Sequence, residues 1–93
     1  MFILLQKKSS NSLTPILAKE LRGKQIRVNT IAPGPTATPL FLDGKSDELI
    51  QTLSLANPLE RLGMPEDIAE AVNSVIHSKW VNGQVIFVNG GMA

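Results

Sequence analysis

The residues best suited to chemistry form a turn that runs from Pro33 to Thr38. It follows a β-branched stretch and combines Gly34 with the hydroxyl-bearing Thr36 and Thr38. A strand that ends in such a turn exposes backbone donors and acceptors at the carboxyl edge of a parallel sheet, where ligands bind. A Pro-Gly-Pro run is also typical of a simple break between two elements. From the hydrophobic periodicity alone, this simple break is favoured over a ligand-binding turn.

Few other side chains have the spacing that catalysis or metal binding requires. The chain has no cysteine, which excludes disulfides, thiolate metal sites and a cysteine nucleophile. Its one histidine, His77, has no second histidine with which to form a metal pair, and we expect it at an exposed helix end, where a cation suits the helix dipole. Lys7 and Lys8 are typical of a solvated basic pair. We therefore predict no metal site.

Composition narrows the classes of partner. The 93 residues carry a formal net charge of +1, and 43% are hydrophobic and 18% charged, as in an ordinary folded domain. Such a balance provides no basic surface for nucleic acid or an anionic membrane. No apolar run approaches the ~20 residues of a membrane helix, and the apolar Met1–Leu5 lacks the preceding basic segment of a secretory signal. We expect no nucleic-acid partner, no membrane association and, by default, a cytoplasmic location.

Hydrophobic periodicity predicts an amphipathic helix followed by a strand in the first third of the chain. Leucines and an isoleucine recur at helical spacing on one stripe, and Gly23 is suited to end that helix. Gln25–Ala32 alternates as a strand does. The apolar stripe consists of Leu13, Ile16, Leu17 and Leu21.

The remainder predicts a long loop, two helices and a strand. Thr36–Gly44 has no clear period. Ser46 is placed to cap a second helix, which Asn57-Pro58 ends, and Pro65 is placed to open a third. Gln84–Val88 is a short β-branched strand. The order helix–strand–loop–helix–helix–strand predicts part of an α/β domain with a parallel sheet covered on both faces.

Four stretches of the sequence carry a specific resemblance. They are Leu17–Gly23, Ile26–Thr38, Asn57–Ala69 and Trp80–Gly91, and they closely resemble the short-chain dehydrogenase/reductase family, in the family's order and over about residues 10 to 93. Thr36–Phe41 is most similar to the branch that is 3-oxoacyl-[acyl-carrier-protein] reductase-like or aldehyde reductase-like.

The resemblance implies the C-terminal portion of a doubly wound, Rossmann-like sheet in an oxidoreductase. In the family, a hydride passes between NADP or NAD and a carbonyl or alcohol. Carried over to this sequence, Pro33 and Gly34 shape the turn on the nicotinamide side. The backbone of Thr36 would hydrogen-bond the nicotinamide carboxamide, and the Thr38 hydroxyl would contact the carboxamide or the phosphates.

The sequence also departs from the family. None of its seven glycines forms the glycine-rich turn that cradles a dinucleotide diphosphate, and the family's catalytic serine has no counterpart. The family's catalytic tyrosine is absent because the chain has no tyrosine. Lys7 falls at the spacing of the family lysine, which puts Ile3, a residue with no proton to give, at the place of the tyrosine. We therefore expect the chain alone to be catalytically incompetent.

Several interpretations of the whole chain follow. Residues 1–93 form a single incomplete Rossmann-like segment, in which residues 1–9 can be interpreted as an unrelated leader. The alternative function is a non-enzymatic interaction or oligomerisation fragment, either a homo-oligomer or one that docks on a full-length relative, with Trp80 at a subunit or domain edge. Two further alternatives are a decayed product that does not fold stably and an incomplete gene model.

Overall fold

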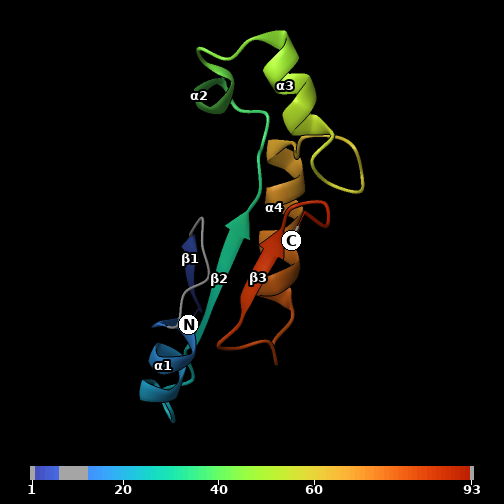
Figure 1. The fold of residues 1–93 in the computed structure, drawn as a ribbon. Coiled ribbons are helices and arrows are strands. Elements are labelled where there is room, and N and C mark those ends of the chain that lie inside the picture. Colours follow the sequence, from blue (N-terminus) through green and yellow to red (C-terminus); the bar gives the residue numbers. More distant parts are fainter. Residues whose placement is uncertain (1, 7–12, 93) are drawn as a thin grey trace.

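The computed structural model describes residues 2–6 and 13–92 (Figure 1). Three strands and four helices occur within them, in the order β1 (Phe2–Gln6), α1 (Leu13–Glu20), β2 (Arg27–Pro33), α2 (Pro39–Leu42), α3 (Asp47–Ser54), α4 (Pro65–His77) and β3 (Val85–Val88).

The three strands form one parallel sheet with β2 in the centre. Ile3 of β1 is in register with Val28, and Val85 of β3 is in register with Thr30. The five residues Val28–Ala32 are buried without interruption. A strand that is buried on both faces is what a parallel sheet covered by helices requires, so the predicted α/β class with a Rossmann-like parallel sheet is confirmed.

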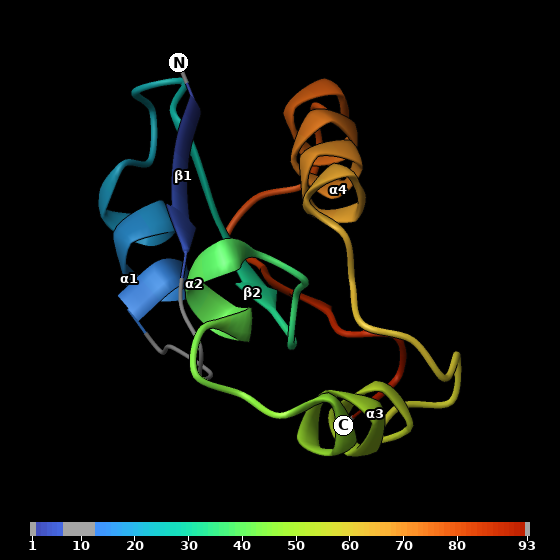
Figure 2. The same cartoon turned by 90° about the horizontal axis from the view of Figure 1, so that it is seen from above.

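Helices α1 and α4 cover opposite faces of this sheet (Figure 2). On one face, the hydroxyl of Thr14 in α1 hydrogen-bonds the hydroxyl of Thr30, and both side chains are fully buried. On the other face, the guanidinium of Arg27 reaches backbone carbonyls at the end of α4. Successive residues of β2 therefore alternate between the two helical layers.

The predicted helix starts are confirmed at two positions. The Ser46 hydroxyl accepts a hydrogen bond from the Leu49 amide at 3.1 Å and caps α3. Pro65 is the first residue of α4. The first helix, predicted to end at Gly23, ends at Glu20 instead, and Gly23 lies in the turn that follows, with φ of +80°, a left-handed conformation that glycine adopts at least cost.

Four other element predictions need correction. Strand β1 was not predicted, although Phe2–Leu5 is the short continuous apolar run of a buried parallel strand. The predicted loop Thr36–Gly44 contains α2, because Thr38 caps a turn that starts with Pro39. Helix α3 ends at Ser54 rather than at Asn57-Pro58.

The fourth correction concerns the apolar stripe of α1. Leu13 and Ile16 are each 52% exposed, whereas the polar Thr14 is 0% exposed. Thr14 can be buried because its hydroxyl has a partner across the helix–sheet contact. The leader interpretation of residues 1–9 stays a prediction: residues 2–6 form β1, and residues 7–9 lie outside the described residues.

The molecule is more extended than a compact domain of its length. Its radius of gyration is 15.2 Å, against about 12 Å for a compact chain of this size. Its accessible surface is 6538 Å², against about 5,300 Å² for a folded protein of this mass. Figure 1 shows why: α2 and α3 form a lobe beyond the carboxyl end of the sheet.

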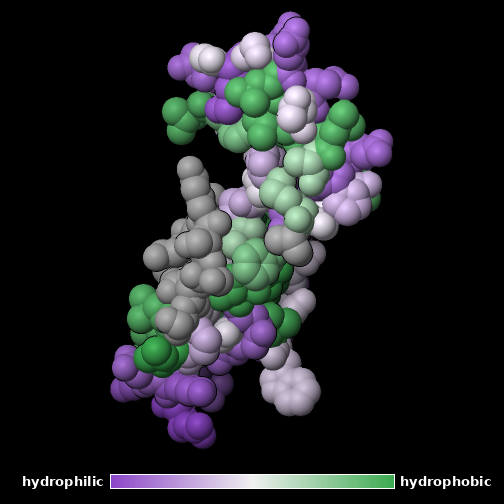
Figure 3. Space-filling view, in the orientation of Figure 1, coloured by the Kyte–Doolittle hydropathy of each residue, from purple (hydrophilic) through white to green (hydrophobic). Residues whose placement is uncertain are grey.

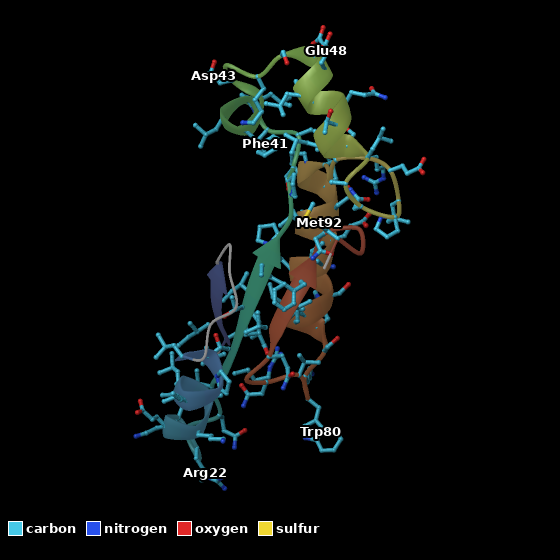
Figure 4. All side chains as sticks on the ribbon, viewed as in Figure 1. Arg22, Phe41, Asp43, Glu48, Trp80 and Met92 are labelled. Atoms are coloured by element: carbon cyan, nitrogen blue, oxygen red, sulfur yellow. The ribbon has the colours of Figure 1, made fainter. Side chains whose placement is uncertain are left out.

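Large apolar side chains lie on this extended surface. Leu40 in α2 is 89% exposed, and Trp80, which projects from the opposite end of the molecule, is fully exposed (Figure 4). Apolar residues also gather on the lobe and along α1 in the space-filling view (Figure 3). The sheet and its helices therefore leave apolar surface uncovered.

Candidate functional site

The predicted site turn begins where β2 ends and lies against the end of β3. The Gly34 amide donates to the Val88 carbonyl at 2.9 Å and extends the pairing of the two strands. A Cβ on Gly34 would lie 2.7 Å from the Cβ of Asn89, closer than carbon atoms approach. The close contact therefore requires glycine at this position.

An isolated parallel bridge between Thr36 and Gly63 holds the middle of the turn. The Gly63 amide donates to the Pro35 carbonyl at 3.0 Å, and the Ala37 amide donates to the Gly63 carbonyl at 2.8 Å. In this parallel arrangement, the flanking residues pair with Gly63, so the amide and carbonyl of Thr36 itself point away from it. The Thr36 carbonyl accepts from the Thr38 amide at 2.8 Å.

The two threonine hydroxyls of the turn have different partners. The Thr36 hydroxyl donates to the Gly34 carbonyl at 2.9 Å, which commits its proton to the main chain. The Thr38 hydroxyl accepts from the Phe41 amide at 3.2 Å and caps α2. A hydroxyl that accepts one hydrogen bond still has its own proton to donate. Thr38 therefore keeps one donor for a ligand.

The turn borders a cavity of about 220 Å³ at the carboxyl edge of the sheet. Its wall joins the turn, the segment before α4 and the end of β3. The residues that line it are Pro35, Leu59, Arg61, Gly63, Asp67, Ile68, Val88, Asn89 and Gly90.

Asn57 supports this wall from behind. Its side chain is 6% exposed, donates to the Arg61 carbonyl at 2.8 Å and accepts from the Leu59 amide at 3.0 Å. A Cβ on Gly90 would lie 2.6 Å from the Asn57 side-chain oxygen, so the chain after β3 packs directly on this amide. From the sequence, Asn57 is predicted only as a helix end, and its contact with the cavity wall is not predicted.

Gly63 and Asn89 were also missed as site residues. Gly63 supplies the bridge to Thr36, and Asn89 fixes the position of Gly34. Both lie inside stretches that carry the family resemblance. Their position within those stretches is the one sequence signal that marks Gly63 and Asn89. Their distance along the chain from the Pro-Gly turn does not indicate that they contact it.

One ion pair lies at the rim of the cavity. Arg61 and Asp67 form two hydrogen bonds, at 2.8 and 3.3 Å, and Asp67 also accepts from the Met64 amide at 2.7 Å. The Arg61 hydrogen bond, with help from the Met64 amide, holds the pKa of the Asp67 carboxyl below its ordinary value. The same hydrogen bond raises the pKa of Arg61. The pair joins the segment before α4 to its first turn.

The other candidate residues lie elsewhere. Lys7 lies outside the described residues, and Ile3, its partner in the family spacing, belongs to β1. His77 is the exposed last residue of α4, and its Nδ1 hydrogen-bonds the Asn73 carbonyl at 2.8 Å, so the expected exposed helix end is confirmed. Residues 2–6 and 13–92 contain no group of three His, Cys, Asp or Glu side chains able to hold a metal.

None of the helices described in the structure has the length and apolar character needed to span a membrane.

A parallel sheet with helices on both faces is the architecture of Rossmann-type folds, in which ligands bind at the carboxyl ends of the strands. The family model described as enoyl-(acyl carrier protein) reductase matches residues 3–93. The chain therefore belongs to the short-chain dehydrogenase/reductase family, as its sequence motifs indicated.

Relatives agree with this assignment. The chain is 49% identical over 81 residues to a short-chain type dehydrogenase/reductase of Picea abies. The matched region covers 85% of this chain and 30% of that relative. It is 42% identical over 87 residues to an NADPH-dependent aldehyde reductase-like chloroplastic protein of Arabidopsis thaliana. That match covers 91% of this chain and 32% of the relative. The chain thus spans about a third of the length of these relatives.

A solved structure shares the fold. A small-chain dehydrogenase in complex with NADPH superposes with a TM-score of 0.81 at 30% identity, over 98% of this chain and 50% of that one. The helices and strands described above therefore recur in a known dehydrogenase.

Proposed function

We propose that this chain forms the nicotinamide side of an NAD(P) site of a short-chain dehydrogenase/reductase. The observation that carries the proposal is the Thr36 amide, which the parallel bridge directs away from Gly63 at the carboxyl edge of the sheet. An amide in that position can donate to the carboxamide oxygen of a nicotinamide ring. When bound, the cofactor supplies or accepts the hydride that interconverts a carbonyl and an alcohol.

The described residues fit this half of the cofactor. The Thr38 hydroxyl, two residues after Thr36, keeps a proton to donate, and the contact of Gly34 with Asn89 fixes the turn that carries both residues. The names of one relative and one solved structure include NADPH, which favours NADP over NAD. The proposal assigns to Pro33, Gly34, Thr36 and Thr38 the roles that the resemblance implies.

The chain does not fit the diphosphate half. A diphosphate needs closely spaced glycines that let several backbone amides approach it, and none of the seven glycines in this sequence has that spacing. We therefore expect only weak binding of the whole dinucleotide by this chain alone.

We further propose that the chain alone does not catalyse carbonyl reduction. The sequence has no tyrosine to protonate a carbonyl oxygen, and Ile3, at the spacing of that tyrosine, has no ionisable proton. The test mixes the purified chain with NADPH and a panel of ketones and aldehydes and follows nicotinamide absorbance. Turnover in a preparation free of full-length enzyme would contradict this proposal.

Binding is tested by amide NMR during titration with nicotinamide mononucleotide, which carries the half of the cofactor that the chain fits. The amides of Thr36 and Ala37 should shift, and Thr36→Pro, which removes the donor, should abolish the shifts. Thr36→Val is the matched control, because it keeps the amide and loses only the hydroxyl. Equal shifts in both variants, or shifts confined to another surface, would contradict the proposal.

A second candidate function is a non-enzymatic fragment that docks on a full-length relative. It is favoured by the full exposure of Trp80 and the 89% exposure of Leu40, since exposed apolar surface promotes association. Size-exclusion chromatography of the chain mixed with a full-length relative tests it. Co-elution that Trp80→Ser or Leu40→Ser abolishes would support docking, and independent elution of the two proteins would contradict it.

A further inference from the structure

The amino edge of the sheet carries most of the positive charge of the described residues. Two segments lead into this edge: residues 19–27, from the last turn of α1 to β2, and residues 77–84, from the end of α4 to β3. They contain five Lys and Arg side chains and one carboxylate, that of Glu20. Residues 28–76 contain seven carboxylates and two basic side chains. The net charge of +1 therefore conceals two regions of opposite sign.

These two regions lie at opposite ends of the molecule. In Figure 4, Arg22 and Trp80 lie at one end, and Asp43 and Glu48 lie at the other. The molecule measures 51 Å along its longest axis, several times the ~8 Å over which physiological salt screens charges. Each end therefore attracts or repels a ligand by itself.

A cavity of about 560 Å³ lies at the basic end. Its volume is within the roughly 300–1,000 Å³ of small-molecule pockets. We call it the basic groove, and its polar wall includes three cationic side chains and one amide, those of Arg22, Arg27, Lys79 and Asn82. No Asp or Glu of the described residues lines it. A ligand in the groove would therefore meet positive charge without competition from a carboxylate.

The main chain holds Arg27 and Asn82 in place and leaves both with N–H groups to donate. The four carbonyl contacts of Arg27, at 2.6 to 3.2 Å, involve only its Nη1 and Nη2 atoms, so its Nε–H has no partner among the described residues. The Asn82 side-chain oxygen accepts from the Val28 amide at 2.9 Å, which leaves the two N–H groups of the same amide to donate. The groove therefore offers oriented donors as well as charge.

Helix ends account for only part of this positive charge. Cations are favourable near helix C-termini, and α1 and α4 both end at this edge. Each helix end carries about half a negative charge, so the two ends and Glu20 together offset about two of the five cations. Within the described residues, the ion pair of Arg61 and Asp67 lies outside both segments. The remaining positive charge therefore has no carboxylate partner there.

We propose that the basic groove binds a small ligand that carries two linked phosphate groups. The planar fork of a guanidinium matches the oxygens of a phosphate, and a phosphate group brings up to about two negative charges, more than a carboxylate does. The carboxylates of the α2–α3 lobe would repel a long polyanion, so a small ligand suits this chain better than a nucleic acid. The proposal is independent of the nicotinamide site at the opposite edge of the sheet.

Pyrophosphate is the probe that tests the proposal. In an amide NMR titration, the amides of Gly23 and Lys79 beside the groove should shift, and the Thr36 amide should not. Succinate should bind about tenfold more weakly, since it carries about half the negative charge. Absence of shifts, equal affinity for succinate, or pyrophosphate shifts confined to Thr36 and its neighbours would overturn the proposal.

A matched pair of lysine variants locates the binding site. Lys79→Gln removes a cation that lines the groove and should weaken pyrophosphate binding about fivefold, the upper range for an exposed ion pair. Lys19→Gln removes the same charge from the same end of the molecule, but Lys19 does not line the groove, so binding should change less than about twofold. Both lysines are exposed, so both variants should keep the wild-type circular dichroism spectrum. Equal weakening in both would show diffuse attraction and contradict a site.

An oligonucleotide is the other source of linked phosphate groups. A short single-stranded oligothymidylate should bind more weakly than pyrophosphate, and its binding should not depend on Trp80, the fully exposed residue next to Lys79. Bases of single strands stack on aromatic side chains. Tighter binding of the oligonucleotide that Trp80→Ala abolishes would therefore overturn the proposal and identify a nucleic-acid strand as the ligand.

Discussion

Gly34 and Asn89 lie so close that no side chain fits on Gly34. A Cβ there would be 2.7 Å from the Asn89 Cβ and 3.0 Å from its Cα, and the second of these atoms belongs to the main chain. Because the backbone after β3 must move to relieve the overlap, the site turn and the end of β3 are mechanically connected. A substitution at either residue should therefore alter the backbone position of the other.

Gly34→Ala should therefore destabilise the fold by about 1–3 kcal/mol, the usual cost of overpacking. Gly63→Ala is the matched control, because a Cβ on Gly63 would meet the Thr36 hydroxyl oxygen at an ordinary 3.5 Å. Urea unfolding followed by circular dichroism measures both variants. Equal midpoints for Gly34→Ala and wild type would show that the contact relaxes without cost.

Arg27 connects the sheet to the last turn of α4. Its guanidinium nitrogens donate to four carbonyls at 2.6 to 3.2 Å, and its Cζ lies 4.5 Å from the centre of the Phe2 ring. A cation at a helix C-terminus both satisfies the last carbonyls and interacts favourably with the helix dipole. The carbonyls belong to Val75, Ile76, Ser78 and Val81.

Arg27→Met should lower the free energy of unfolding by about 1.5–3 kcal/mol, the range for a hydrogen bond to a charged group. Arg27→Lys should recover only part of the loss, because one ammonium group cannot reproduce the planar fork. The exposed Arg22 provides the control variant, Arg22→Met. Hydrogen exchange should show faster opening of the last turn of α4 in Arg27→Met, and an unchanged exchange rate there would contradict the capping role.

Much of this fold could be predicted from local sequence. Ser46 and Pro65 mark helix starts by their own chemistry, and β-branched residues mark β2. Arg27 could be placed on one face of its strand by alternation, but not paired with carbonyls 48 to 54 residues further along the chain. Contacts of that sequence separation depend on tertiary packing, on which local patterns carry no information.

In the candidate site too, some residues could be predicted from local sequence and others could not. The turn Pro33–Thr38 could be located because proline and glycine punctuate the chain, and the resemblance added its expected chemistry. Gly63, which aims the Thr36 amide, could not be found from spacing because a parallel bridge between distant segments leaves no periodic signal.

Asn29 is a fully buried polar residue that joins β2 to the start of β3. Its side chain donates to the Val81 carbonyl at 3.0 Å and accepts from the Gln84 amide at 3.1 Å. Asn29→Ala leaves both main-chain groups without these partners, so we expect a loss of about 1–3 kcal/mol. Asn73→Ala, on the exposed side of α4, is the control. Urea midpoints measure both, and a neutral Asn29→Ala would mean that water replaces the side chain.

The ion pair of Arg61 and Asp67 predicts a pH dependence. Because the Arg61 hydrogen bond and the Met64 amide lower the pKa of Asp67 in the folded state, the pair stabilises the fold above the ordinary aspartate pKa of about 3.9. This stabilisation is lost as the pH falls from that value through the lower, folded-state pKa. Both side chains are partly solvent-exposed, so we expect a small effect.

Asp67→Asn should therefore lower the urea midpoint slightly at neutral pH, and the difference from wild type should shrink below about pH 4. Glu66→Gln removes the same charge from the same helical turn and leaves the Arg61 pair intact, so its difference from wild type isolates the general effect of charge. A gap between Asp67→Asn and wild type that stays constant to acid pH would show that the lost contact is not the ionised carboxylate. An asparagine oxygen can still accept the hydrogen bond from the Met64 amide, so loss of that bond would not explain such a constant gap. A change in packing at the start of α4 would then be the remaining cause.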